Sequence, residues 1–224
     1  MKLLITGADR PLGRLATDYF QTTHDLTLTG QAAALNDDHA GLPYRPVDLR
    51  QPDAVKPLLA GVEAILHLDI FDPQPLTGPQ AEQNRLDIAA RGTYVLLSEA
   101  RQAGVERLIL ASSLAHFDAY PQDYVIDESW QPEPAPNADA LAPYLGEIVC
   151  REFAREGGIR AICLRFGPLD APGGTPGNEA LQALSGALAL PFTKTGYRWR
   201  LFHLTTAQRF TTNAARQALT IPPP

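Results

Sequence analysis

The feature that most constrains the fold is the amino-terminal stretch MKLLITGADRPLGR, in which an apolar run leads into a loop with two glycines. The short continuous apolar run at residues 3–5 is typical of a parallel strand that is covered on both faces. Pro11 and the apolar spacing of residues 12–20 predict a helix directly after the loop. We therefore predict a strand, a tight glycine loop and a helix, in that order.

This loop has the features of an anion-binding site. Gly7 allows a tight turn after the strand, and Gly13 lets the helix pack closely on the sheet. Backbone N–H groups and the positive end of the helix dipole would then attract the pyrophosphate of a dinucleotide. Arg10 and Pro11 stand where a complete loop carries a third glycine, so an ordinary strand-to-helix turn is the alternative interpretation.

Size and charge limit the class of protein and of partner. A chain of 224 residues with 45% hydrophobic residues is long enough for one well-buried domain, so we predict a single domain over residues 1–224. The net charge of −6 and the lack of a Lys/Arg block argue against nucleic-acid or membrane partners and favour a small molecule. Only two cysteines, and no apolar stretch near the roughly 20 residues of a membrane helix, predict a reduced cytoplasmic protein.

Short strand and helix patterns alternate along most of the chain. Apolar runs bounded by turn residues predict further strands at residues 25–29, 44–47, 64–68, 107–111, 159–165 and 197–204. Helical spacing predicts helices at residues 52–60, 80–103, 140–156, 179–190 and 205–220. This alternation predicts an α/β fold, a Rossmann-type doubly wound parallel sheet whose carboxyl edge carries the ligands.

The end of the second predicted strand bears on the choice of cofactor. An acidic residue at this position selects NAD by bonding the adenosine ribose, and the sequence has none there. Gly30 and Gln31 leave room for the 2′-phosphate of NADP, and Arg10 could pair with that phosphate. We therefore expect NADP or NAD as the cofactor, with NADP slightly favoured. A solvated loop arginine is the alternative interpretation of Arg10.

Six segments spread along almost the whole chain carry a family resemblance. They are LLITGADRPLGR, VDLRQPDAVKPLLAGVEAILHL, RGTYVLLSEARQAGVERLILASS, VIDESWQPEPAPNADALAPYLGE, IRAICLRFGP and RLFHLTT. Together they resemble the extended short-chain dehydrogenase/reductases of the NAD(P)-dependent epimerase/dehydratase type, which include uronate dehydrogenases. The resemblance implies hydride transfer, with a tyrosinate as the base and a serine that holds the substrate oxygen. It also implies a homodimer through the two long helices.

Carried over residue by residue, the resemblance gives the expected site. Ser113 and Tyr144 become the catalytic residues, although some members use the position of Leu114 in place of Ser113. Asp48 and Leu49 are expected to flank the adenine, and Leu68 to form part of a wall near the ribose and pyrophosphate. The remaining expected cofactor-binding residues belong to the glycine loop and the start of its helix: Gly7, Arg10, Leu12 and Gly13. No metal is expected, because His67 and His116 lack ligand spacing and are better explained as core or surface histidines.

The chain departs from the family pattern at its catalytic centre. The family has a lysine four residues after the tyrosine, where its ammonium lowers the pKa of the tyrosine. Ile148 occupies this position, and no lysine occurs between Lys56 and Lys194. Ala89 replaces an asparagine of the proton relay. Residues 166–224 leave only a reduced substrate lobe, which suits a compact uronic or aldonic acid.

Three interpretations of function remain open from the sequence. The first is an NAD(P)-dependent oxidoreductase or epimerase with weakened activity on a small sugar or uronic acid. The second is a catalytically inactive cofactor-binding sensor or scaffold, and the third is a structural relative that binds no dinucleotide. Tyr144 as a packed aromatic, and Ser112 or Ser113 as a cap of the strand end, are the corresponding structural alternatives. We favour retained cofactor binding, and the sequence leaves catalytic activity undecided.

Overall fold

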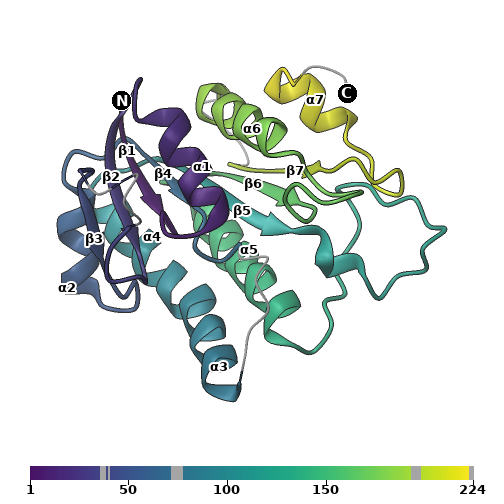
Figure 1. Ribbon diagram of the computed structural model, residues 1–224, viewed down its shortest axis with the longest axis horizontal. Coiled ribbons are helices and arrows are strands. Elements are labelled where there is room, and N and C mark those ends of the chain that lie inside the picture. Colours follow the sequence, from purple (N-terminus) through teal and green to yellow (C-terminus); the bar gives the residue numbers. More distant parts are fainter. Residues whose placement is uncertain (36–38, 40, 72–77, 193–197, 222–224) are drawn as a thin grey trace.

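A seven-stranded parallel sheet forms the centre of the molecule (Figure 1). The computed structural model describes residues 1–35, 39, 41–71, 78–192 and 198–221. The strand order is β3-β2-β1-β4-β5-β6-β7, and all neighbouring strands run parallel. This arrangement confirms the predicted Rossmann-type doubly wound sheet. The strands are β1 (Lys2–Thr6), β2 (Asp25–Gly30), β3 (Tyr44–Pro46), β4 (Ala64–His67), β5 (Arg107–Ser113), β6 (Arg160–Phe166) and β7 (Trp199–Leu204).

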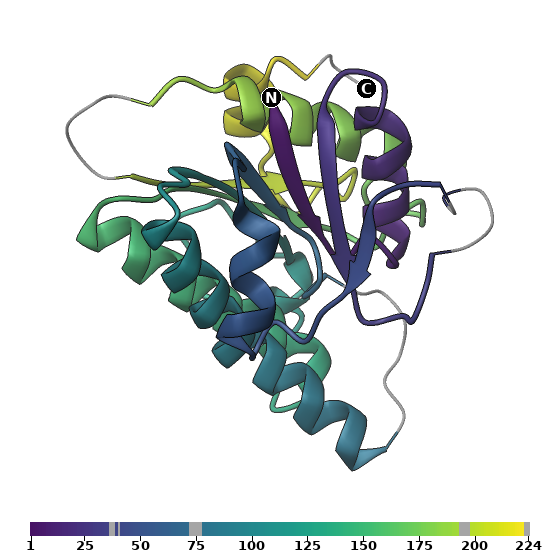
Figure 2. The ribbon, with the colours of Figure 1, turned by 90° about the vertical axis from the view of Figure 1, so that its left-hand side faces the viewer.

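Helices cover both faces of the sheet and give a three-layer molecule (Figure 2). One face is covered by α1 (Pro11–Phe20), α6 (Gly177–Ala189) and α7 (Asn213–Leu219). The other is covered by α2 (Pro52–Val55), α4 (Thr93–Gln102) and α5 (Ala138–Glu156), while α3 (Pro79–Asp87) packs against α5. Among the described helices, none is long and apolar enough to cross a membrane.

Each face of the sheet has its own hydrophobic core. Leu3 and Ile5 of β1 point into the core beneath α1 and α6, whereas Leu4 points into the core beneath α4 and α5. All three side chains are fully buried. Alternate side chains of a strand point to opposite faces, so a strand that is covered on both sides has a continuous apolar run. This explains why the amino-terminal apolar run identified β1.

The helix predicted at residues 80–103 is interrupted. α3 ends at Asp87, a π-helical turn occupies Ile88–Gly92, and α4 begins at Thr93. The turn packs tightly on the segment after β3, because a Cβ at Gly92 would lie 3.2 Å from Leu49 Cβ. A π-helical turn widens the helix locally, and hydrophobic spacing alone does not reveal it.

The helix predicted at residues 205–220 is shorter in the structure, where α7 spans Asn213–Leu219. The hydroxyls of Thr205 and Thr206 donate hydrogen bonds to the carbonyl oxygens of residues 173–174, at 2.8 and 3.1 Å. Threonine side chains that bond a neighbouring loop compete with helix formation. These contacts hold the segment after β7 against the carboxyl edge of the sheet.

Candidate cofactor groove and active site

The glycine loop joins β1 to α1 at the carboxyl edge of the sheet. Gly7 has a φ of +69°, and a Cβ there would lie 2.6 Å from Asp69 Cα at the end of β4. A Cβ at Gly13 would lie 1.9 Å from the carbonyl oxygen of Gly7. Arg10, the residue before α1, makes no side-chain hydrogen bond to the first helical turn. The loop is therefore tight, and the first N–H groups of α1 have no cap from this residue.

Three neighbouring cavities lie in a row along this edge, and together they are called the groove here. The first, of about 280 Å³, lies beside the ends of β2 and β3, and the second, of about 190 Å³, lies beside the glycine loop. The third, of about 360 Å³, lies beyond the ends of β5 and β6. Gln31 and Asp69 line the first and second cavities, and Arg85 lines the second and third. Because neighbouring cavities share lining residues, the groove runs from β3 to β6.

Three of the seven expected cofactor-binding residues line these cavities. Asp48 and Leu49 line the first cavity, and Arg10 lines the second. Leu12 and Leu68 are fully buried in the core beneath α1 and do not line the three cavities, so their contact with a cofactor stays a prediction.

Asp48 is held in place by Arg50. The guanidinium donates hydrogen bonds from Nε and Nη2 to the two carboxylate oxygens, at 2.8 and 2.9 Å. These bonds lower the pKa of the Asp48 carboxyl despite its partial burial. The carboxylate therefore stays ionised at the rim of the first cavity.

The space beside Gly30 is filled by the Asp9 carboxylate of the glycine loop. Asp9 Oδ2 accepts hydrogen bonds from the backbone N–H groups of Gln31 and Ala32, at 3.1 and 2.9 Å. A Cβ at Gly30 would lie 1.9 Å from Asp9 Oδ1. Gly30 and Gln31 also line the first cavity, so the expected room for a 2′-phosphate stays a prediction. The Asp9 carboxylate nevertheless occupies the side of Gly30 where a Cβ would lie. The pattern at the end of β2 did not reveal this, because Asp9 comes from another element.

The third cavity is the candidate substrate site. Ser113 lines it, and its Oγ accepts a hydrogen bond from the backbone N–H of Ala115 at 3.1 Å. Arg85 and Arg209 bring positive charge to the wall, and Arg85 Nη1 pairs with Asp139 Oδ1 at 3.0 Å. Arg209 Nε is buried and makes no hydrogen bond within the described residues. A ligand acceptor in this cavity would find donors on its wall.

Tyr144 lies outside this cavity. Among the described residues of α5, Pro143 lines the third cavity, whereas Tyr144 and Ile148 line a separate cavity of about 50 Å³ that Arg165 also borders. The structure therefore does not bring Ser113 and Tyr144 together on the wall of one cavity.

The rotation of α5 follows from Glu147. Residues four apart lie on one helix face, so Pro143 and Glu147 point the same way, toward the sheet. Glu147 is 4% exposed, and its carboxylate accepts hydrogen bonds from Arg165 Nε and Nη2 at 2.8 and 2.7 Å. Tyr144 follows Pro143, and Ile148 follows Glu147. One residue of an α-helix corresponds to a rotation of about 100°, so both side chains are turned away from the face that carries Pro143 and Glu147.

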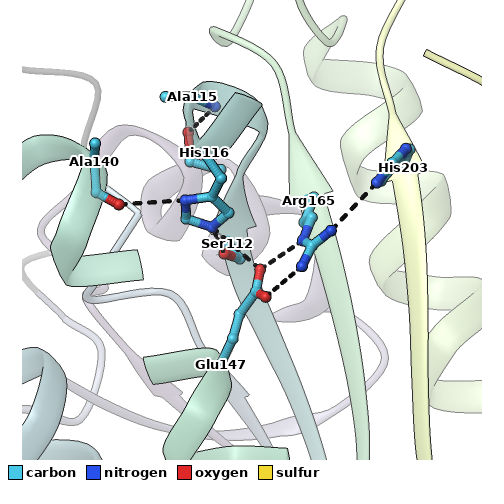
Figure 3. A network of polar contacts seen from close by, with 8 residues as sticks. Ser112, Ala115, His116, Ala140, Glu147, Arg165 and His203 are labelled. Atoms are coloured by element: carbon cyan, nitrogen blue, oxygen red, sulfur yellow. Dashed lines mark hydrogen bonds and ion pairs between the residues drawn. The ribbon is translucent and has the colours of Figure 1, made fainter. Parts of the chain in front are cut away.

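A buried polar network surrounds Glu147 (Figure 3). His116 Nε2 lies 3.2 Å from Glu147 Oε1 and 3.0 Å from Ser112 Oγ, and His116 Nδ1 lies 3.2 Å from the carbonyl oxygen of Ala140. Burial by itself would raise the pKa of Glu147, but hydrogen bonds from Arg165 and His116 hold it well below its ordinary value. The carboxylate is therefore ionised inside the protein.

The network extends to β7 through His203. Its Nε2 lies 3.5 Å from Arg165 Nη1, and its ring contacts Phe117 with centroids 5.8 Å apart. Burial, together with the charge of Arg165, lowers the pKa of His203 to about 3. The ring is therefore neutral at physiological pH.

Ser112, His116 and Glu147 do not form a nucleophile triad. In such a triad the serine and the carboxylate contact opposite nitrogens of the imidazole. Here the same nitrogen, Nε2, faces both, and all three side chains are buried. The sequence analysis missed this network, and its one signal was an acidic residue within the buried stripe of α5.

Comparison with known proteins decides the family. Residues 3–200 match the model of the NAD dependent epimerase/dehydratase family. The chain belongs to this family. A uronate dehydrogenase of Pseudomonas syringae pv. tomato is 30% identical over 169 residues, which cover 74% of this chain and 58% of that protein. The uncharacterized protein YbjS of Escherichia coli is 30% identical over 181 residues, which cover 76% of this chain and 52% of that protein. The chain therefore spans little more than half the length of these relatives.

Solved structures of family members have the same fold. A mutated uronate dehydrogenase superposes with a TM-score of 0.80 at 20% identity, over 100% of this chain and 81% of that chain. MoeE5 in complex with UDP-glucuronic acid and NAD superposes with a TM-score of 0.78 at 18% identity, over 100% of this chain and 94% of that chain. These similarities show that the chain has the same fold as these proteins.

Proposed function

We propose that this epimerase/dehydratase family member binds a nicotinamide dinucleotide along the groove. The observation that carries the proposal is the row of three neighbouring cavities from the segment after β3 to Ser113. An extended ligand with a ring at each end fits such a groove, at the edge of a doubly wound sheet where dinucleotides bind. The family match supports the same class of cofactor.

The residues along the groove fit the parts of a dinucleotide. Asp48 and Leu49 would hold the adenine, and the backbone around Gly7 and Gly13 would hold the pyrophosphate at the amino end of α1. Ser113 lies at the nicotinamide end. When bound, the nicotinamide supplies a hydride acceptor or donor. The chain itself supplies binding, orientation and a wall that limits access of water.

We further propose a small sugar or uronic acid as the substrate class. The third cavity has a volume of about 360 Å³, which suits a compact molecule, and Arg85 and Arg209 lie on its wall. Guanidinium groups form strong charge-assisted hydrogen bonds with a carboxylate. Ser113 on the same wall would hold a substrate hydroxyl. The similarity to a uronate dehydrogenase supports this class.

Hydride transfer on this site is proposed to be slow. Tyr144 borders a different cavity, Ile148 stands at the lysine position, and Pro143 on the wall of the third cavity has no group that accepts a proton. Loss of a matched general base typically removes about 10² to 10⁴ in rate. The second candidate function is a catalytically inactive cofactor-binding sensor or scaffold, which the position of Pro143 favours.

The proposal includes a cytoplasmic homodimer. Tyr94 on the outer face of α4 is 58% exposed and packs edge-on against Phe153 of α5, with ring centroids 5.6 Å apart. A second copy of the chain on these helices would cover this aromatic surface.

An absorbance assay at the nicotinamide wavelength tests the proposed chemistry. The full chain is given uronic acids, aldonic acids and aldoses with each dinucleotide. Turnover well below the usual range of about 1 to 10³ per second supports weakened hydride transfer. Dinucleotide binding without turnover on any substrate supports the sensor or scaffold. Ordinary turnover contradicts the weakened site.

A further inference from the structure

We infer that Asp9 makes the groove selective for NAD(H) over NADP(H), by fixing a negative charge where the 2′-phosphate of NADP(H) would lie. The inference rests on the proposed dinucleotide binding and deepens it. It reverses the preference expected from Arg10 and Gly30, because the structure places the Asp9 carboxylate against Gly30.

The Asp9 carboxylate is held in a fixed position. It spans from the glycine loop to the segment after β2, where Oδ2 accepts hydrogen bonds from two successive backbone N–H groups, Gln31 and Ala32, at 3.1 and 2.9 Å. Any side chain at Gly30 would collide with Oδ1, since a Cβ there would lie 1.9 Å away. Gly30 and Asp9 thus form one unit in which the glycine makes room for the acid.

This position is the cofactor-selecting position of the fold. In dinucleotide-binding sheets an acid at the end of β2 bonds the adenosine ribose and excludes a 2′-phosphate. Here β2 ends at Gly30 without an acid, and Gly30 and Gln31 line the first cavity. The carboxylate of Asp9 lies against both residues. The loop after β1 therefore supplies, through Asp9, the acidic group that the end of β2 lacks.

Two carboxylates lie near the end of β2. No Lys, Arg or His side chain among the described residues forms an ion pair with Asp9, and Oδ1 has no hydrogen-bond partner there. Asp69 lines the first cavity and accepts a hydrogen bond from Gln31 Nε2 at 3.3 Å, whereas Asp9 contacts the lining residues Gly30 and Gln31 from behind. Burial, followed by the charges of Asp9 and Asp69, raises the pKa of Tyr44 to about 12, while the charge of Arg10 opposes this rise.

Arg10 is the competing charge, and its position is different. It lines the second cavity with Gln31, Asp69 and Arg85, and it is not among the described residues that line the first. Its charge also acts on Tyr44, but Asp9 and Asp69 influence the pKa of that hydroxyl more strongly. We therefore assign Arg10 to the pyrophosphate segment, which NAD and NADP share.

Calorimetric titration of the full chain with NADH and with NADPH tests the inference. The key variant is Asp9→Asn, which removes the charge but keeps an oxygen that accepts from Gln31 and Ala32. The matched control is Asp25→Asn, which changes an exposed acid at the first residue of β2, at the end opposite to Gly30. We expect the parent to bind NADH at least tenfold more tightly than NADPH. Asp9→Asn should reduce the ratio of the two affinities, mainly by strengthening the binding of NADPH. Asp25→Asn should leave this ratio unchanged.

Other outcomes overturn the inference in distinguishable ways. Equal affinities in the parent, or a preference for NADPH, contradict the role of Asp9 while leaving dinucleotide binding intact. An unchanged ratio in Asp9→Asn, with both affinities lowered together, shows that Asp9 only fastens the loop. Binding of neither dinucleotide by the folded parent overturns the inference together with the proposed function.

Discussion

Arg165 on β6 donates hydrogen bonds from Nε and Nη2 to the two carboxylate oxygens of Glu147 on α5, at 2.8 and 2.7 Å. The side chains of both are almost fully buried, with 4% and 5% exposed. A buried pair contributes little compared with an apolar pair, but removal of one partner leaves a buried charge without compensation. This pair fixes the rotation of α5 about its own axis relative to the sheet. A substitution at either residue therefore tests that orientation.

Glu147→Gln should destabilise the protein strongly, because it leaves the Arg165 guanidinium buried without a counter-charge. The expected loss in unfolding free energy is about 3–5 kcal/mol, measured by urea denaturation. Glu152→Gln on the same helix is the matched control, since it removes only exposed pairs with Arg151 and Arg155. A loss for Glu147→Gln no larger than that of the control would contradict the buried pair.

His67 should make the stability fall in mild acid. Its Nδ1 and Nε2 lie 2.6 and 2.9 Å from the hydroxyls of Thr6 and Thr93, and burial lowers its pKa to about 4 from 6.5. The unfolded chain therefore binds a proton that the folded chain excludes, and stability is lost as the pH falls from 6.5 to about 4. The shift corresponds to about 3 kcal/mol.

Urea denaturation at several pH values measures this slope. His67→Gln should reduce it between pH 6.5 and 4, and the buried His203, whose pKa is lowered to about 3, should supply a remaining slope. The matched control His24→Gln, nearer the surface, should leave the slope close to that of the parent. A parental slope in His67→Gln would show that other groups cause the loss in acid.

The fold was predictable because its signals are local. Period and composition identified β1 and the glycine loop, since a doubly covered strand must be continuously apolar and Gly7 must adopt a positive φ. The site was less predictable, because it depends on contacts between distant segments. Asp9 of the glycine loop bonds to the segment after β2. The rotation of α5 about its axis depends on the bond from Arg165 of β6 to Glu147. Neither contact has a periodic signal.

Ile148→Lys tests whether the missing lysine alone limits catalysis. The sequence by itself predicts a gain in turnover, because the ammonium would lie one helical turn from Tyr144. The structure predicts no gain, since Ile148 lines the small cavity with Arg151 and Arg165. The one carboxylate among the described residues of that wall, Glu147, already pairs with Arg165, so that a third positive charge is unfavourable there. Thermal denaturation should show a lower Tm. A clear rise in nicotinamide-linked turnover would instead place Tyr144 in the active site.

Tyr94→Arg should convert the proposed homodimer to a monomer, because it places a charge in the aromatic surface of α4 and α5. Light scattering at micromolar concentration measures the mass. Tyr19→Arg is the matched control, since Tyr19 is also exposed, at 45%, but lies on α1 across the sheet. A parent protein of monomeric mass would contradict the dimer.

Calorimetric titration of the parent and of Asn84→Trp with NADH tests the central claim, that a dinucleotide lies along the groove. Asn84 lines the first and second cavities, so an indole there should block the groove, whereas Gln83→Trp on the exposed side of the same helix is the control. The account predicts saturable binding of one NADH per chain by the parent and by Gln83→Trp, and at least tenfold weaker binding by Asn84→Trp. Binding unaffected by Asn84→Trp, or a folded parent that binds neither NADH nor NADPH, would contradict it.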